Sequence, residues 1–327
     1  MIEQDAKQIV KQLDLRQLEG KTVMIAGASG LIGSYFLACL KQVRQVKVVA
    51  VIRSQPKAYW LKLADFKDVR IMRGDLTDLN FCQSLPRADV IIHAAGYGQP
   101  GRFLLKPLKT LKLYTLTTFF LLDKLKPGGK FLYISSSEVY SGLKALVYHE
   151  NQIGRTNTDH PRACYIEAKR AGEATCQAAK SQGVNVKICR LALAYGPGTR
   201  KDDQRVLYQL IVEGLKGEIR LLDNGRVMRT YCYVADSVEV MWQILLKGKE
   251  TVYNVGGESR TSIANLAGKI GKYLKVKVII PNQSAAKLGA PEDVRLDLSK
   301  IKKEFHKTKF ISLNEGLRRT IEWLKQL

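Results

Sequence analysis

A tyrosine and a lysine four residues apart are the side chains of this sequence best suited to acid–base chemistry. Tyr165 and Lys169 stand in ACYIEAKRAGE, within a predicted helix from about residue 164 to residue 182. Positions i and i+4 share one helix face, so the phenol and the ammonium can point into one cleft. Lowering a tyrosine pKa from about 10 to about 7 requires roughly 4 kcal/mol, which nearby positive charges in a partly dry site can supply. Taken alone this spacing is common, and a surface tyrosine–lysine pair would be the default interpretation.

Hydroxyl groups and a carboxylate follow a predicted central strand at residues 130–137. The sequence KFLYISSSEVY places Ser135, Ser136, Ser137 and Glu138 at its carboxyl end, where ligands bind in open α/β sheets. Hydroxyls there can hold a substrate oxygen, and Glu138 can act on a second proton. The alternative is a run of turn and capping residues.

A glycine-rich turn follows the first apolar strand and opens a helix. Gly27, Gly30 and Gly33 occupy the spacing G-x-x-G-x-x-G. Glycines at these points permit a tight turn, let the backbone approach a pyrophosphate and allow close packing of helix on strand. We therefore predict a dinucleotide site, to which Ser29, Leu31 and Ile32 also contribute.

The strand at residues 46–52 ends in Arg53, where NAD-binding proteins commonly carry an acidic residue. A guanidinium can stack on adenine and pair with a ribose 2′-phosphate, so NADP is indicated at least as strongly as NAD. Asp75 is an expected contact on the adenine side. The alternative for Asp75 is an N-cap for the next helix.

Short apolar runs separated by helices predict a doubly wound α/β fold: a parallel Rossmann sheet with a smaller C-terminal α/β substrate-binding lobe. A helical arm at 1–20 should precede an NAD(P)-binding domain at 21–196. Residues 197–327 should form mainly the substrate-binding lobe, with 229–257 returning to the first domain. The predicted elements are strands at 22–27, 46–52, 69–76, 90–96, 130–137 and 184–192 and helices at 104–126, 164–182 and 203–216.

Composition narrows the class of protein further. The 327 residues are 46% hydrophobic and 25% charged, as in ordinary globular proteins. We find no apolar run long enough to cross a bilayer and no signal-peptide pattern, so a cytoplasmic protein is expected. The six cysteines lie far apart, which favours buried free thiols over disulfides or a metal site.

The formal net charge of +23 raises nucleic acid or anionic membrane as partners. Lysine and arginine are nevertheless spread along the chain, which is typical of a solvated basic surface. We expect neither a specific nucleic-acid partner nor a membrane partner. A diffuse positive field would also attract a polyanionic small substrate such as a nucleotide diphosphate.

Together these motifs resemble the extended short-chain dehydrogenase/reductase family, from about residue 20 onward. Ser136, Tyr165 and Lys169 match the family's catalytic positions, and HAAG at 93–96, LAYGPG at 193–198, RTYCYVAD at 229–236 and YNVGG at 253–257 are further likenesses. The resemblance implies NAD or NADP as cofactor. It extends the predicted cofactor contacts to Leu76, Ala94, Ala95, Gly96, Tyr165 and Lys169.

Within that family, SSEVY at 136–140 and RACYIEAKR at 162–170 look most like UDP-glucuronate decarboxylases. Related 4,6-dehydratases carry an aspartate as acid where this chain has Ser137, which argues against dehydration. The resemblance assigns Arg205 and Arg229 to the diphosphate of a nucleotide sugar and implies a homodimer paired through helices 104–126 and 164–182. Arg53, Tyr114 in place of the usual asparagine, and YGQPGRF at 97–103 depart from the family pattern.

These implications predict C4 oxidation of a nucleotide-diphosphate sugar to a 4-keto sugar, with Tyr165 as base, Ser136 orienting and Lys169 tuning it. A C6 carboxylate would then be lost as carbon dioxide, whereas a C6 hydroxyl would lead to 4-epimerisation. Arg53 favours an NADPH-dependent 4-ketoreductase as the alternative. The net charge leaves a third possibility, a catalytically silent NAD(P)-binding or nucleic-acid-binding regulator.

Overall fold

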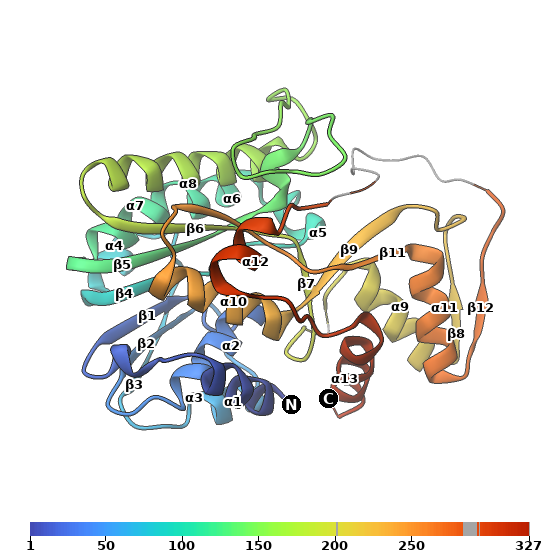
Figure 1. Ribbon diagram of the computed structural model, residues 1–327, viewed down its shortest axis with the longest axis horizontal. Coiled ribbons are helices and arrows are strands. Elements are labelled where there is room, and N and C mark those ends of the chain that lie inside the picture. The colour runs from blue at the N-terminus through green and yellow to red at the C-terminus, as the bar shows by residue number, and fades with distance from the viewer. Residues whose placement is uncertain (201, 284–292, 294, 327) are drawn as a thin grey trace.

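The computed structural model describes residues 1–200, 202–283, 293 and 295–326, and its centre is a seven-stranded parallel sheet (Figure 1). The strand order is β3-β2-β1-β4-β5-β6-β10, which continues the 3-2-1-4-5-6 order of doubly wound dinucleotide-binding sheets. The predicted fold class is confirmed. The strands are β1 (Thr22–Ala26), β2 (Lys47–Ile52), β3 (Val69–Arg73), β4 (Ala88–His93), β5 (Leu125–Ser136), β6 (Asn185–Leu191) and β10 (Val252–Val255).

Helices cover both faces of this sheet, which explains why its central strands are almost continuously apolar. One face packs against α2 (Leu31–Leu40), α3 (Ala58–Ala64) and α10 (Val234–Lys247). The other packs against α4 (Leu79–Ser84), α6 (Pro107–Tyr114), α7 (Leu116–Asp123) and α8 (Ala163–Ser181). Two large hydrophobic cores result, one on each face of the sheet.

The single helix predicted at 104–126 is wrong. The segment instead contains α6 and α7, preceded by the short α5 (Pro100–Phe103). Pro107 begins α6 as a first-turn residue, and Thr115 interrupts the path with φ −101° and ψ −80°. The break places the side chain of Tyr114, the last residue of α6, in the protein interior.

The second lobe is built around two small sheets (Figure 1). Its elements are β7 (Leu193–Tyr195), β8 (Glu218–Arg220), β9 (Met228–Tyr233), β11 (Ser259–Ser262), β12 (Lys277–Ile279), α9 (Val206–Leu215), α11 (Ile263–Leu274) and α13 (Leu313–Lys325). β9 pairs with β7 and β11, so the return to the main sheet begins with α10 at Val234 and not at residue 229. After β10 the chain re-enters the second lobe, and α12 (Ser299–Phe305) packs back against β10.

The N-terminal arm forms α1 (Ile2–Gln12) and the 3₁₀ turn η1 (Arg16–Leu18). The Asp5 carboxylate on α1 is buried and accepts hydrogen bonds from Tyr35 of α2 at 3.0 Å and Tyr233 of β9 at 2.7 Å. It also pairs with Arg319 of α13 at 2.8 Å. One carboxylate thus connects the arm to both lobes, and Figure 1 shows the two ends of the chain side by side.

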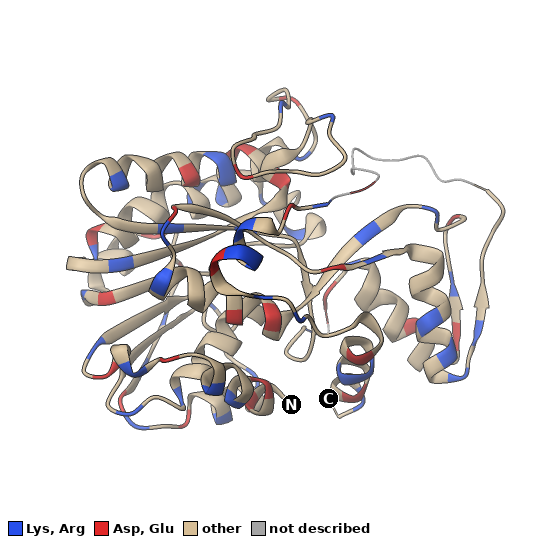
Figure 2. Ribbon diagram, in the orientation of Figure 1, with Lys and Arg blue, Asp and Glu red and all other residues tan. Residues whose placement is uncertain are grey.

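Lysine and arginine are distributed over both lobes without gathering on one element (Figure 2). Among the described residues, no helix is long and apolar enough to cross a membrane. Five of the six cysteines are buried and Cys164 is half-buried; none of the six is in a disulfide.

Candidate active site

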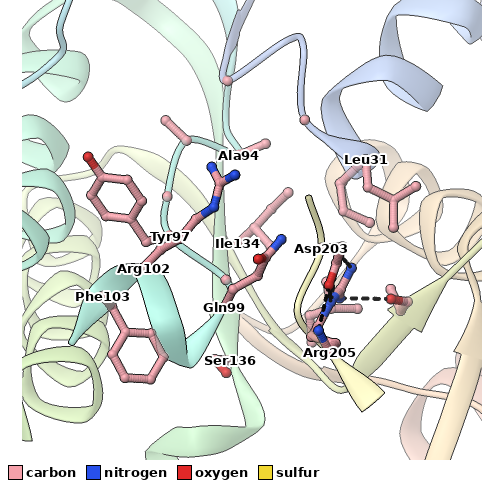
Figure 3. Close-up of a pocket in the computed structure, with 18 of the residues that line it drawn as sticks. Leu31, Ala94, Tyr97, Gln99, Arg102, Phe103, Ile134, Ser136, Asp203 and Arg205 are labelled. Atoms are coloured by element: carbon pink, nitrogen blue, oxygen red, sulfur yellow. Dashed lines mark hydrogen bonds and ion pairs between the residues drawn. The ribbon is translucent and has the colours of Figure 1, made fainter. Parts of the chain in front are cut away.

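A cavity of about 630 Å³ opens at the carboxyl end of the main sheet, between the two lobes. In Figure 3, Tyr97, Gln99 and Phe103 from the segment after β4 face Asp203 and Arg205 of the second lobe across this space. The predicted site residues that line it are Gly27, Ser29, Gly30, Leu31, Ile32, Arg53, Asp75, Leu76, Ala94, Ala95, Gly96, Ser136, Ser137, Glu138, Tyr165, Lys169, Arg205 and Arg229. Residues from eight separate stretches of sequence therefore meet at one cavity.

The glycine turn has the close approaches that the dinucleotide prediction requires. Gly27 has φ +87°, and a Cβ there would lie 2.7 Å from the backbone of Ala95. Gly30 is the N-cap of α2, so the first turn of that helix faces the cavity. Gly33 does not line the cavity; a Cβ there would lie 2.3 Å from the Gly27 oxygen, so Gly33 supports the turn by packing. The turn fits a pyrophosphate, and its backbone N–H groups would hold that group.

Arg53 and Asp75 line the same end of the cavity. The Arg53 guanidinium lies 5.0 Å from the ring centroid of Tyr97 and donates a hydrogen bond to its hydroxyl. Asp75 pairs with Lys109 and accepts hydrogen bonds from the backbone N–H and hydroxyl of Thr77. Burial would raise the pKa of Asp75, but the bonds from Lys109 and Thr77 outweigh it and lower that pKa.

The alternative interpretation of Asp75 as a helix N-cap is wrong. Asp78 caps α4 and accepts hydrogen bonds from the Asn80 and Phe81 N–H groups. Asp75 closes the turn ahead of it, which leaves its charge at the wall of the cavity.

The Tyr165 phenol lies in a nest of aromatic rings. α8 begins at Ala163, so Tyr165 stands in its first turn and Lys169 one turn later. Phe103 stacks on Tyr165 with centroids 4.5 Å apart and planes at 12°, and Tyr114 meets it edge to face at 5.6 Å. Tyr165 is 7% exposed and Lys169 5%. The surface pair considered as the alternative is therefore excluded.

Burial raises the pKa of Tyr165 to about 12. A hydrogen bond with the Ser136 hydroxyl and the charges of Arg162 and Arg205 lower it, whereas the charge of Glu138 raises it. The protein groups alone thus keep the phenol protonated at neutral pH. A positively charged nicotinamide beside it would favour the phenolate.

Lys169 is held away from solvent by the main sheet. Its ammonium donates a hydrogen bond of 2.5 Å to the Ile134 oxygen on β5 and lies 6.0 Å from the Tyr165 ring centroid. Burial lowers the pKa of Lys169 to about 7, while the charge of Glu173 opposes this shift. The lysine charge is therefore sensitive to small changes in its surroundings near neutral pH.

The serines after β5 have separate roles. Ser135 donates a 2.5 Å hydrogen bond to Glu173, which in turn pairs with Arg190 at 2.8 Å beneath the site. Ser136 faces the cavity and accepts a hydrogen bond from the Glu138 N–H, capping the 3₁₀ turn η2 (Ser137–Tyr140). Ser136 thus caps the turn, as the alternative interpretation expects, and also lines the cavity, where its role in the site stays a prediction.

Glu138 is paired with a residue that the sequence did not single out. Arg162 donates from Nη2 to Glu138 at 2.7 Å, and its guanidinium lies 5.6 Å from the Phe103 ring. Both charged side chains line the cavity. The position of Arg162, three residues before Tyr165 on one helix face, could have revealed it. Phe103 gave no comparable signal, because it lies in the separate short helix α5 and reaches Tyr165 only through the fold.

Arg205 and Arg229 reach the cavity from the second lobe. Arg205 pairs with the buried Asp203 at 2.6 Å and donates to the Ala194 oxygen at 3.1 Å, as Figure 3 shows. Arg229 donates to the Met228 oxygen at 2.7 Å, and burial lowers its pKa. Two guanidinium groups thus line the cavity from the second lobe, across from the lobe that carries the glycine turn. Phosphate oxygens would suit both groups there.

The chain is similar in sequence to proteins of a known family. The model of the NAD dependent epimerase/dehydratase family matches residues 23–256. UDP-glucuronic acid decarboxylase 1 of Xenopus tropicalis is 28% identical over 319 residues, covering 95% of this chain and 74% of that protein. The dTDP-4-dehydro-6-deoxy-D-allose reductase of a Streptomyces species is 30% identical over 293 residues, covering 86% of this chain and 85% of the reductase.

Solved structures share the fold over nearly the whole chain. Epimerase Mth375 of Methanothermobacter thermautotrophicus matches with a TM-score of 0.84 at 19% identity, covering 98% of this chain and 96% of that one. The dTDP-glucose 4,6-dehydratase DesIV of Streptomyces venezuelae, solved with NAD, matches with a TM-score of 0.81 at 21% identity, covering 93% and 97%. This chain belongs to the NAD-dependent epimerase/dehydratase family of nucleotide-sugar enzymes.

Proposed function

We propose that this protein oxidises C4 of a nucleotide-diphosphate sugar to a ketone and then removes a C6 carboxylate as carbon dioxide. One observation carries the proposal: the buried Tyr165 phenol, with Ser136 and Lys169, lines the cavity that both the glycine turn and the second-lobe arginines face. The UDP-glucuronic acid decarboxylases among its relatives support this choice of substrate class.

In the first step Tyr165 accepts the proton of the C4 hydroxyl. Bound NAD(P)⁺ supplies the acceptor for the C4 hydride. Ser136 orients the hydroxyl through the same oxygen that interacts with Tyr165, and the ammonium of Lys169 stabilises negative charge in this pocket. The C4 carbon loses a hydride and its oxygen loses a proton, which leaves the ketone.

A C6 carboxylate beside a C4 ketone makes a β-keto acid. The C5–C6 bond breaks, carbon dioxide leaves and the electron pair becomes an enolate spread over C5, C4 and the C4 oxygen. A proton from solvent adds at C5 and restores the ketone. Return of the hydride to C4, with Tyr165 returning its proton to the C4 oxygen, would then give the pentose and regenerate the cofactor. Ser137 offers a hydroxyl at the position where dehydratases need an acid, and Glu138 is held in an ion pair with Arg162. These two features favour loss of carbon dioxide over loss of water. With a C6 hydroxyl, the same 4-keto intermediate would lead to a 4-epimer.

A product assay tests the proposal. Purified protein with NAD⁺ or NADP⁺ is offered UDP-, dTDP-, GDP- and CDP-sugars with either a C6 carboxylate or a C6 hydroxyl, and products are identified by mass. We expect carbon dioxide and a pentose nucleotide from a uronate substrate. Epimer formation from a hexose substrate would reassign the second step, and absence of turnover and of binding across the panel would reject the proposal.

A second candidate function is reduction of a nucleotide-linked 4-keto sugar by NADPH. It is favoured by Arg53, which can pair with a 2′-phosphate, and by the reductase relative. This reaction consumes NADPH in proportion to product, whereas decarboxylation regenerates its cofactor. Absorbance at the NADPH band therefore separates the two functions.

We also infer that the protein forms a homodimer through α6 and α7. These helices and the residues just before them expose large apolar side chains, of which Leu105 is 81% and Leu108 75% exposed. The other exposed members of this apolar surface are Leu104, Leu116 and Phe119. A second copy of the same surface would bury them. Sedimentation should show a dimer that Leu108→Glu weakens.

A further inference from the structure

A second buried phenol stands beside the proposed base. Tyr114 is 2% exposed, lines the cavity and presents its ring edge to face with Tyr165 at 5.6 Å. The Tyr97 N–H donates a hydrogen bond to the Tyr114 oxygen. The two phenol rings are therefore in contact at the wall of the cavity.

Two glycines make room for Tyr114. A Cβ at position 96 would lie 2.0 Å from the Tyr114 hydroxyl oxygen, and a Cβ at position 172 would lie 2.7 Å from the Tyr114 carbonyl oxygen. The segment after β4 and the middle of α8 thus both lack side chains where Tyr114 passes. Gly96 thus makes room for the Tyr114 hydroxyl, and Gly172 makes room for the Tyr114 backbone.

The ammonium of Lys169 lies over the Tyr114 ring. Its nitrogen is 3.8 Å from the Tyr114 ring centroid and 6.0 Å from that of Tyr165. A cation over the face of an aromatic ring at this distance is attracted by the ring. The same positive charge withdraws electron density from the phenol, which makes its O–H a stronger hydrogen-bond donor.

We propose that Tyr114 is a positioning residue for the base: its ring holds the Lys169 ammonium, and its hydroxyl donates a hydrogen bond to the Tyr165 oxygen as that phenol loses its proton. This inference rests on the proposed role of Tyr165. Tyr114 itself neither gains nor loses a proton. The proton lost by Tyr165 in each half-cycle is the one that the substrate hydroxyl exchanges with it.

The direction of donation agrees with the burial of the two groups. Burial, then the charges of Tyr165 and Tyr133 and a hydrogen bond with Tyr165, raise the pKa of Tyr114 well above its ordinary value. Tyr114 therefore keeps its proton over the range in which Tyr165 would titrate. Once Tyr165 has lost its proton it can only accept, so the protonated Tyr114 must be the donor of the pair.

Tyr133 provides a matched control. It is fully buried, its ring lies 5.1 Å from the Lys169 nitrogen, and its hydroxyl has no hydrogen-bond partner. Tyr114→Phe and Tyr133→Phe each remove one buried hydroxyl next to the same ammonium and keep the ring. Only the first removes the proposed donor.

The test is a pH titration of the Tyr165 phenol in the NAD⁺-loaded protein, followed by NMR of tyrosine labelled with ¹³C at Cζ. Tyr165→Phe identifies the resonance. Losing one hydrogen bond to the phenolate should raise the Tyr165 pKa by about one pH unit in Tyr114→Phe. Tyr133→Phe should leave it unchanged. With an active substrate, the acid limb of the kcat profile should move by the same amount while KM stays constant.

A second variant protects the test against misfolding. 3-Fluorotyrosine at position 114 keeps the shape of the side chain but makes its hydroxyl a stronger donor, so the Tyr165 pKa should fall. Equal behaviour of Tyr114→Phe and Tyr133→Phe, or no response to fluorination, would overturn the inference. If the wild-type protein turns over no nucleotide sugar, the proposed function fails, while the titration still decides whether Tyr114 donates to Tyr165.

Discussion

The glycine turn and the aromatic nest around Tyr165 are two halves of one cavity that arise in opposite ways. The turn is a single stretch of seven residues, from Gly27 to Gly33, in which backbone contacts closer than 3 Å leave no room for a Cβ at Gly27 or Gly33. The nest combines Phe103, Tyr114 and Tyr165 from three segments of chain, brought together only by packing of the helices on the sheet. The first is readable as a local motif, whereas the second exists only in the folded protein.

The two regions therefore differ in what they contribute: the glycine turn shapes a binding surface, and the aromatic nest sets pKa values. The turn needs close backbone approach and has no room for a side chain at Gly27 or Gly33, so its contribution is shape. The nest is buried. Burial raises the pKa of Tyr165 to about 12 and lowers that of the neighbouring Lys169 to about 7. The pKa values of both proposed catalytic groups are thus set by neighbours distant in sequence.

The largest effect on activity should come from removing the Tyr165 hydroxyl. Tyr165→Phe should lower kcat by roughly 10²- to 10⁴-fold, because a general base contributes about that factor. Cofactor affinity should stay within a few-fold, since the turn is untouched. Tyr208→Phe, at another part of the cavity wall, is the control. Normal activity of Tyr165→Phe would show that the nest has no catalytic role.

A methyl group in the turn should affect binding and folding together. Gly33→Ala places a Cβ 2.3 Å from the Gly27 oxygen, and overpacking of this kind costs about 1–3 kcal/mol. A lower melting temperature and weaker NAD⁺ binding by calorimetry are expected. Gly98→Ala is the matched control, because a Cβ there meets no atom within 4 Å. Equal behaviour of the two variants would contradict a turn defined by close approach.

Lys169, which is buried beside the nest, should make the free energy of unfolding depend on pH. The pKa of Lys169 is lowered to about 7, so between about pH 7 and pH 10 the unfolded chain binds more protons than the folded one. The free energy of unfolding of the wild type, relative to Lys169→Met, should therefore rise with pH across this window by at least about 1.4 kcal/mol. Denaturant titrations at several pH values measure it. A difference that falls with rising pH would place the charge in an environment that favours it.

The smallest effect concerns the adenosine end of the cavity beyond the turn. Arg53→Ala should weaken NADP⁺ binding about fivefold to tenfold relative to NAD⁺, since it removes one charge-assisted contact. Calorimetry with both cofactors measures the ratio. Arg70→Ala, on the exposed edge strand β3, should leave the ratio unchanged. An unaltered ratio in Arg53→Ala would mean that this guanidinium serves Tyr97 and not the cofactor.

Features encoded in one local stretch could be predicted from the sequence, whereas features that depend on packing between distant segments could not. The strands of the main sheet, the glycine turn and the helix carrying Tyr165 and Lys169 follow from local patterns and are predicted from the sequence. The break at Thr115 was missed, because the residues around it favour a helix and only its surroundings impose φ −101° and ψ −80°. β9 was assigned to the wrong sheet, since an apolar strand carries no mark of its partner. Arg162 was missed although its spacing from Tyr165 was visible.

The arm that begins the chain has a consequence for how the cavity can open. Asp5 joins α1 to α2 in the first lobe and to β9 and α13 in the second, so parting the lobes with α1 kept on α2 would break two hydrogen bonds to one buried carboxylate at once. Hinge motion of whole lobes is therefore costly on this side of the molecule.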